Sequence, residues 1–460
     1  MFLETVRSEG LGCLSYIFGD GGKAAVIDPR RDCKVYVDIA NRHGAQITHI
    51  FETHRNEDFV IGSLELARRT GAKIYHGAAL PFKYGENVKD GDKFTLGKIA
   101  LNILETPGHT PESISITLSD AGFSEKPIAV FTGDALFIGD TGRTDFYEDR
   151  KEELAGELYD SIHKKLLPLG DHVILYPAHG AGSVCGANLA EREFSTLGFE
   201  RQFSPLLQKS REDFIAHKVN EEHYYAPYFK QMEKFNQGGI PLKTKLPEPK
   251  PVSAHDFDAA IREEHMLVVD IRSPEAFAGA HIPGSLSIPL NMLSAFAGWF
   301  LPYDSPIGLV AENKNDVEQA RIYLMRIGFD NVTRYLEGGL HAWEVGGFEF
   351  ERVPAVSIGA LKKRVEAKED LLVLDVRSHS EYEAMPSQHS KHMYLGELPH
   401  HIKDIPRNRK IVTLCASGRR AVIAASLLQQ SGFKDVEVCF GSMAACSVPD
   451  VKTDHVPQAA

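Results

Sequence analysis

Apolar residues in the first 180 positions gather in short runs that end in polar residues, glycine or proline. Examples are AAVIDP (24–29), ITHIFET (47–53) and IAVFTGD (128–134). Short apolar runs with such boundaries are typical of buried strands. Helical periodicity begins near residue 151 and returns in a long region near 186–235. The pattern predicts a strand-rich sandwich whose functional residues lie on the loops that leave the strands.

The second half of the chain contains an internal repeat. HMLVVDIRSPEAF (265–277) parallels DLLVLDVRSHSEY (370–382), and 306–332 parallels 410–436. Each copy reads as an apolar strand, a loop, a helix and a Gly-Phe exit to another strand. Strands that alternate with helices favour small α/β units with a parallel sheet.

A segment rich in proline, glycine and lysine separates the two halves. NQGGIPLKTKLPEPKPVS (236–253) lacks both apolar periodicities and is therefore predicted to be a linker. The predicted organisation is a first domain over 1–237, a linker over 238–251, and two α/β domains over 252–352 and 354–450.

Composition and charge exclude several classes of partner. The 460-residue chain has a net charge of −12 and no long basic run, so we expect neither nucleic acid nor an anionic membrane surface as a partner. Its apolar stretches are shorter than the ~18 residues of a membrane span. The N-terminal segment carries charged residues where an export signal needs a continuous apolar core, so we expect a cytoplasmic protein.

Six scattered cysteines do not form a disulfide framework, so a special cysteine is expected to be catalytic. Cys13, Cys33 and Cys185 are interpreted as buried apolar residues.

Candidate metal ligands follow the predicted strands of the first domain. THRNEDF (53–59) nearly matches T-H-x-H-x-D-H, a motif that feeds a two-metal site, but Asn56 and Phe59 replace its second and third histidines. Further candidates lie in PGHT, TGD and PAH, next to glycine or proline. The full set of candidates is His54, Asp58, His109, Asp134 and His179.

This order of motifs resembles the metallo-β-lactamase fold, an αββα sandwich. In its two-metal members, such as glyoxalase II, one metal needs a histidine at position 56 and the other needs one at 59. Asn56 is a weak, neutral ligand and Phe59 cannot ligate, so a tight two-metal site is not expected. A degenerate, metal-free fold and a mononuclear zinc hydrolase are the alternatives.

The remaining set, His54, His109 and Asp134, matches the two-histidine, one-carboxylate pattern of non-haem Fe(II) oxygenases. The chain resembles the persulfide dioxygenases of this fold. The resemblance implies one Fe(II) per chain on these three residues, with zinc as the alternative metal. It implies as substrates O₂ and a small thiol persulfide, whose carrier is glutathione, coenzyme A or a similar thiol. The product is sulfite.

The same resemblance implies roles for four further residues. Arg143, in DTGRTDF, shapes the substrate site, and Tyr176, in LYPAH, lies near the iron. Asp58 and His179 become groups that orient ligands and water.

A second candidate site is the loop CASGRR, which follows an apolar strand and precedes a helix. Backbone N–H groups of such a loop and the helix N-terminus stabilise a thiolate at Cys415. The pattern C-x-x-G-x-R resembles rhodaneses, which pass sulfane sulfur through a cysteine persulfide. The substrate-binding residues that the loop implies are Ser417, Gly418, Arg419 and Arg420.

The middle copy keeps the rhodanese framework but lacks the nucleophile. Ala311 aligns with Cys415, and AENKND replaces CASGRR, so the domain over 252–352 is predicted to be an inactive rhodanese. The third domain has an atypical C-terminal edge, where Cys439 and Cys446 are expected to be buried, with a redox role toward Cys415 as the alternative.

The combined prediction is a persulfide dioxygenase fused to one inactive and one active rhodanese, with thiosulfate formed or used and sulfide detoxification as the outcome. The resemblance also implies a homo-oligomer. One alternative is a glyoxalase II-like mononuclear zinc hydrolase fused to a sulfurtransferase. The other is a non-catalytic sulfur carrier or scaffold.

Overall fold

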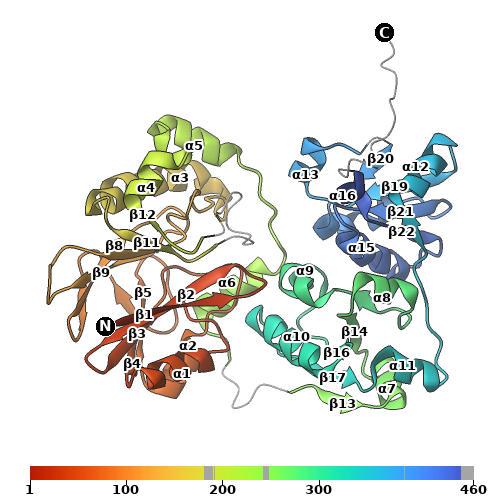
Figure 1. Cartoon of the computed structure of the whole chain (residues 1–460), viewed down its shortest axis with the longest axis horizontal. Coiled ribbons are helices and arrows are strands. Elements are labelled where there is room, and N and C mark those ends of the chain that lie inside the picture. The colour runs from red at the N-terminus through yellow and green to blue at the C-terminus, as the bar shows by residue number, and fades with distance from the viewer. Residues whose placement is uncertain (181–189, 191, 242–247, 388, 447–460) are drawn as a thin grey trace, which may run out of the picture. The chain divides into compact units, whose positions relative to one another are not determined.

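The computed structural model describes residues 1–180, 190, 192–241, 248–387 and 389–446 (Figure 1). The chain divides into two compact units. The first consists of 1–244 with 325–328, and the second of 245–324 with 329–460.

The first unit contains two six-stranded sheets. The first sheet has the order β1 (Phe2–Ser8), β2 (Cys13–Asp20), β3 (Lys23–Ile27), β4 (Gln46–Phe51), β5 (Lys73–Gly77) and β6 (Glu86–Val88). The second has the order β12 (Ser195–Thr196), β11 (Ile174–Pro177), β10 (Ala129–Gly133), β9 (Ile114–Asp120), β8 (Ile99–Glu105) and β7 (Lys93–Leu96). Strands β3 to β6 run parallel to one another, as do β10 and β11, whereas β7 to β10 are antiparallel.

Helices cover the outer faces of both sheets. The α-helices described in this unit are α1 (Lys34–Arg42), α2 (Ser63–Thr70), α3 (Lys151–Asp160), α4 (Leu197–Phe203), α5 (Arg211–Asn220) and α6 (Phe229–Gly238). Tyr36 of α1 and Leu66 of α2 pack on the first sheet, whereas Leu158 of α3 and Phe214 of α5 pack on the second. Aromatic residues such as Phe131 fill the core between the sheets. The predicted αββα sandwich is therefore confirmed.

The second unit contains two five-stranded sheets in which every described pairing is parallel. One has the order β13 (Lys250–Val252), β17 (Val332–Leu336), β16 (Ile307–Val310), β14 (Leu267–Asp270) and β15 (Leu286–Ser287). The other has the order β18 (Ala355–Ser357), β22 (Val436–Phe440), β21 (Lys410–Leu414), β19 (Leu371–Asp375) and β20 (Ser390–His392). The two parallel-sheet domains that the repeat predicted are both present.

The helices of this unit include four that begin at a serine cap, two in each copy of the repeat. The helices are α7 (Ala254–Glu263), α8 (Pro274–Gly279), α9 (Leu293–Phe300), α10 (Lys314–Arg326), α11 (Gly339–Val345), α12 (Ile358–Glu366), α13 (His379–Ala384), α14 (Leu398–His401), α15 (Arg419–Gln430) and α16 (Ser442–Cys446). Helices α7, α8, α12 and α13 each follow a serine whose hydroxyl accepts a backbone N–H of the first turn.

Equivalent backbone contacts relate the two copies. In the first, the Ile271 N–H donates to the Val310 carbonyl, and in the second the Val376 N–H donates to the Leu414 carbonyl. The residue after each acceptor therefore occupies the same place, which is Ala311 in one copy and Cys415 in the other. The Asp-x-Arg pairs also correspond: Arg272 binds Asp270, and Arg377 binds Asp375 and the carbonyl of Met385.

Both ends of the predicted linker belong to regular elements. Helix α6 extends to Gly238, and β13 begins at Lys250 as an edge strand. Pro251 is accommodated there because an edge strand has one side without ladder hydrogen bonds. None of the helices in the described ranges is long and apolar enough to cross a bilayer.

Candidate metal centre and cysteine loop

The predicted metal-binding residues lie on loops that follow strands of both sheets. His54 and Asp58 follow β4, and His109 lies between β8 and β9. Asp134 follows β10 directly, and His179 follows β11. None of the five is more than 2% exposed.

Three of these side chains form one group. Ligand atoms of His54, His109 and Asp134 all lie within 4.8 Å of one another. Oδ2 of Asp134 is 3.4 Å from Nε2 of His109 and 3.7 Å from Nε2 of His54. These separations suit ligands that share one cation.

Hydrogen bonds orient both imidazoles with Nε2 toward this carboxylate. Nδ1 of His109 lies 2.9 Å from the Arg143 carbonyl oxygen, which can only accept, so Nδ1 carries the proton. Nδ1 of His54 lies 2.9 Å from Oγ1 of Thr53, whose own proton goes to Asp28. Each Nε2 therefore presents a lone pair, as a metal-ligating histidine must.

The protonation states of the two histidines and the aspartate suit the binding of a metal cation. Burial lowers the pKa of His54 to about 3 and also lowers the pKa of His109, so both rings are neutral at pH 7. Burial alone would raise the pKa of Asp134, but the neighbouring histidines hold it below its usual value. The buried Nε2 of His109 and Oδ2 of Asp134 have no hydrogen-bond partner. Two neutral imidazoles and one carboxylate with unpartnered atoms fit a divalent transition metal.

Asp58 and His179 form a second group with a cysteine. His179 lies between two carboxylates, with Nδ1 2.7 Å from Oδ1 of Asp134 and Nε2 3.1 Å from Oδ2 of Asp58. The Cys13 thiol lies 3.4 Å from the same Asp58 oxygen. Burial, and then Asp58, raises the pKa of Cys13 to about 12, so it remains a thiol. Cys13 was predicted to be only a buried apolar residue, but it borders the site.

The two positions that lack histidine, 56 and 59, have a neutral amide and an apolar ring. The amide nitrogen of Asn56 donates to the His54 carbonyl, and Phe59 is packed in the interior. Asn236 of α6 holds the loop because its amide donates to the carbonyls of both residues. Sequence reasoning missed Asn236, since no motif signals a residue 180 positions away.

Sequence reasoning also missed Glu57, which occupies an unspecified position of the motif. Its Oε1 accepts from the Arg55 guanidinium at 3.0 Å. Its Oε2 has no hydrogen-bond partner and lies 3.8 Å from Nε2 of His109. The only sequence signal was an acidic residue inside a metal-binding motif.

The structure gives Arg143 and Tyr176 surroundings that the sequence did not predict. The Arg143 guanidinium is buried and forms a two-pronged ion pair with Asp145, at 2.6 and 2.7 Å. Its carbonyl, as described, orients His109. The half-buried ring of Tyr176 contacts Tyr16 and Phe131. Substrate contact by Arg143 and proximity of Tyr176 to iron stay predictions.

A glycine next to Arg143 makes close packing in the site possible. A Cβ on Gly142 would lie 2.0 Å from the Asp134 carbonyl oxygen and 3.0 Å from Nδ1 of His109. We expect Gly142→Ala to displace both ligands and weaken metal binding by about 10–100-fold, as loss of a ligand-orienting contact does. Metal titration of the purified protein measures this effect. Gly238→Ala is the control, because a Cβ there meets open space; equal affinities in the two variants would contradict the prediction.

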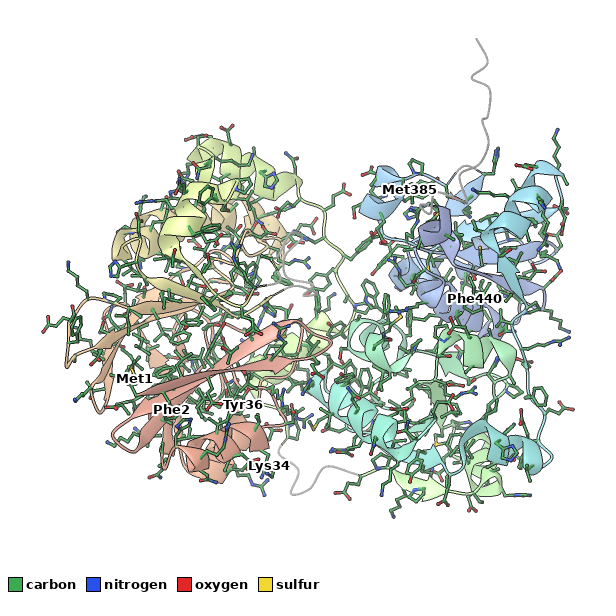
Figure 2. All side chains as sticks on the ribbon, in the orientation of Figure 1. Met1, Phe2, Lys34, Tyr36, Met385 and Phe440 are labelled. Atoms are coloured by element: carbon green, nitrogen blue, oxygen red, sulfur yellow. The ribbon has the colours of Figure 1, made fainter. Side chains whose placement is uncertain are left out.

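The cysteine loop has the geometry that the sequence predicted. Strand β21 ends at Leu414, and Cys415 follows with its side chain fully buried. The Gly418 N–H lies 3.0 Å from Sγ, and Gly418 has a φ of 101°. A Cβ there would lie 2.9 Å from the ring of Phe440. Phe440 is the last residue of β22 and is labelled in Figure 2. Only glycine suits this turn, and its N–H stabilises negative charge on sulfur.

The middle copy closes the corresponding loop with a side chain. Oδ1 of Asn313 accepts the N–H groups of Asn315 and Asp316 at the start of α10. In the third domain no side chain caps α15. The first turn of α15 therefore keeps N–H groups that an anion can bind, whereas Asn313 occupies those of α10.

The two arginines of the cysteine loop differ in their contacts and exposure. Arg420 forms a bidentate ion pair with Glu381, with both contacts at 2.6 Å, whereas Arg419 and Ser417 are exposed. Burial opposes ionisation of Glu381, but Arg420 and the α13 cap lower its pKa to about 2. Arg420 is therefore engaged by Glu381, whereas Arg419 is exposed, and substrate binding by either residue stays a prediction.

The described cysteines form no disulfide with one another; they are Cys13, Cys33, Cys415 and Cys439. Cys439 is fully buried on β22. Cys185 and the side chain of Cys446 lie outside the described residues.

Comparisons with known proteins agree with this architecture. The metallo-beta-lactamase superfamily profile matches residues 9–179, and the rhodanese-like domain profile matches residues 253–345 and 357–447. A metallo-beta-lactamase structure from Staphylococcus aureus subsp. aureus COL has a TM-score of 0.66 and 33% identity, covering 73% of this chain and 98% of that chain.

Curated relatives specify the family further. The chain is 30% identical over 209 residues to the mitochondrial persulfide dioxygenase ETHE1 of Bos taurus, and 30% identical over 216 residues to that of Homo sapiens. The matches cover 44% and 45% of this chain, and 74% and 76% of those proteins. The chain therefore belongs to the persulfide dioxygenase family of the metallo-beta-lactamase superfamily, in a form that also carries two rhodanese-like domains.

Proposed function

We propose that the N-terminal domain is an iron-dependent persulfide dioxygenase. The reaction is R–S–SH + O₂ + H₂O → R–SH + SO₃²⁻ + 2 H⁺. The observation that carries the proposal is the buried set of His54, His109 and Asp134, with one lone pair of each imidazole directed at one carboxylate. This set provides a single cation with three protein ligands and leaves other coordination positions for substrates.

The protein groups would act by holding and insulating the reacting centre. Bound Fe(II) would supply the redox chemistry that O₂ requires. His54 and His109 would bind the ion through Nε2, and Asp134 would neutralise part of its charge. His179 would hold the second oxygen of Asp134, since its Nδ1 lies 2.7 Å away. Burial of all four limits competing water and strengthens these interactions.

The third domain is proposed to transfer sulfane sulfur through Cys415. Its persulfide would react with sulfite as Cys–S–S⁻ + SO₃²⁻ → Cys–S⁻ + S₂O₃²⁻, which forms one sulfur–sulfur bond and breaks another. The Gly418 N–H stabilises the thiolate that leaves. Arg419, which is exposed at the start of α15, would attract sulfite. The reverse reaction would deliver sulfur from thiosulfate.

The two activities would act as consecutive steps of sulfide detoxification. Sulfite made by the first domain would be a substrate for Cys415, and fusion would raise its local concentration. The persulfide carrier is proposed to be a small thiol such as glutathione or coenzyme A, and the chain to form a homo-oligomer.

The decisive experiment measures O₂ consumption and sulfite formation by the iron-loaded full chain with several persulfides, including those of glutathione and coenzyme A. We expect stoichiometric uptake of O₂ and release of sulfite with at least one of them. A zinc-bound protein that hydrolyses thioesters and consumes no O₂ would contradict the proposal and favour a mononuclear hydrolase.

The middle copy allows a test of whether a cysteine alone is sufficient for sulfurtransferase activity in this loop. Ala311→Cys is expected to produce no sulfurtransferase activity above background, because the new thiol would face N–H groups that Asn313 already occupies. The measurement is thiosulfate:cyanide sulfurtransferase activity in a Cys415→Ser background. Activity within about tenfold of wild type, a free-energy difference of about 1.4 kcal/mol, would show that the nucleophile alone suffices.

A further inference from the structure

The interior of the first domain contains an acidic side chain that the proposed reaction has not used. Glu57 is 1% exposed, and its Oε2 has no hydrogen-bond partner. That atom lies 3.8 Å from Nε2 of His109, which is also unpartnered. A buried carboxylate oxygen and an imidazole lone pair that face each other across this distance both lack a positive partner.

The position of Glu57 is held on both sides. The Asn236 amide donates to the carbonyls of Asn56, which precedes Glu57, and of Phe59, which lies two residues after Glu57. Glu112 joins its loop to that of His109, because one Glu112 oxygen accepts both the Arg55 N–H and the Thr110 hydroxyl. The distance between Glu57 and His109 is therefore set by a network rather than by a flexible side chain.

The guanidinium that contacts Glu57 is divided between two carboxyl groups. Arg55 lies 3.0 Å from Oε1 of Glu57 and 3.6 Å from a carboxyl oxygen of Glu233. The guanidinium of Arg143 is engaged by Asp145. The other oxygen of Glu57, Oε2, is buried without a hydrogen-bond partner, and a divalent cation at the centre would provide the positive partner that this oxygen lacks.

We propose that Glu57 is a fourth protein group of the metal centre, whose carboxylate faces the bound divalent cation and strengthens its binding. In a chain that lacks the histidine at position 56, an acidic residue one position further along supplies negative charge to the same centre. The inference rests on the metal centre of the proposed function but not on the reaction that occurs there.

The test compares cation affinity in Glu57→Gln and in wild type. Glutamine keeps the size of the side chain and removes its charge. Binding of Fe(II) under anaerobic conditions, and of Co(II), is measured on the full chain by competition with a chromophoric chelator. We expect Glu57→Gln to bind both ions about 10–100-fold more weakly. The visible absorption of bound Co(II) should also change, because its surroundings lose a carboxylate.

Glu233→Gln is the matched control. It removes the other carboxylate partner of Arg55, lies partly exposed at 25%, and should leave both affinities within about twofold of wild type. Thermal unfolding of the metal-free variants separates loss of folding from loss of metal, because a purely structural Glu57 would lower the metal-free Tm without changing affinity. A Glu57→Gln protein with wild-type affinity and Co(II) spectrum overturns the inference alone, whereas a wild type that binds neither ion overturns the metal centre as well.

Discussion

Replacing His109 by alanine is expected to remove O₂ consumption and most of the bound iron. His109 presents its Nε2 lone pair 3.4 Å from Asp134, and its Nδ1 proton is fixed by the Arg143 carbonyl. Alanine removes this Nε2 lone pair, so that only His54 and Asp134 of the three-residue set remain to bind the ion. Because loss of even an indirect contact costs about 10–100-fold in metal affinity or activity, loss of a ligand should exceed about 100-fold. The measurements are iron content after anaerobic loading and O₂ uptake with a persulfide.

A second buried histidine of the same domain provides the control. His76 is 2% exposed, and its Nε2 contacts the Tyr84 carbonyl. His76→Ala should lose stability but retain iron in the folded fraction. If His109→Ala kept iron and O₂ uptake near wild-type levels, the assignment of the metal centre would be wrong. His109→Ala should also retain sulfurtransferase activity, because Cys415 lies in a different domain.

Replacing Cys415 by serine is expected to reduce thiosulfate:cyanide sulfurtransferase activity by about three orders of magnitude or more. Serine keeps the shape of the loop, but its hydroxyl is a far weaker nucleophile at neutral pH and cannot carry sulfane sulfur. The Gly418 N–H, which lies 3.0 Å from Sγ, stabilises a thiolate that serine does not form. Mass spectrometry after incubation with thiosulfate should show one added sulfur atom on wild type and none on Cys415→Ser.

Cys439→Ser separates this effect from general loss of a buried cysteine. Cys439 is fully buried on the neighbouring strand β22. The variant should retain sulfurtransferase activity if Cys439 only packs in the core, whereas a large loss would indicate a redox role toward Cys415. Both cysteine variants should keep O₂ uptake, and a Cys415→Ser protein with full sulfurtransferase activity would place the nucleophile elsewhere.

Local patterns predicted the fold class because each element satisfies its own physical requirement. The apolar runs of the first domain became strands β3, β4 and β10, and the Asp-x-Arg-Ser repeat became β14 and β19 with their capped helices. Positions at strand exits also predicted that the candidate residues lie on loops, since the loops after β10 and β21 carry Asp134 and Cys415.

Such local patterns could not predict contacts between segments that lie far apart in the sequence. Cys13 reaches Asp58 across 45 positions, and Arg420 reaches Glu381 across 39. Short-range periodicity describes which face of an element is buried, but it does not describe which loop that face meets. A cysteine at the start of a strand and a glutamate at a helix cap therefore carried no signal of their partners.

The sequence by itself determined the order of the domains, the absence of histidine at positions 56 and 59, and the presence of a candidate nucleophilic cysteine in only one of the two copies of the repeated fold. These are properties of residue type and spacing. Only the tertiary structure decided that His54 and His109 present unprotonated Nε2 atoms, because their tautomers depend on Thr53 and on the Arg143 carbonyl. It also decided that Glu57 turns its unpartnered oxygen toward His109, because that direction is set by packing between loops that the sequence keeps far apart.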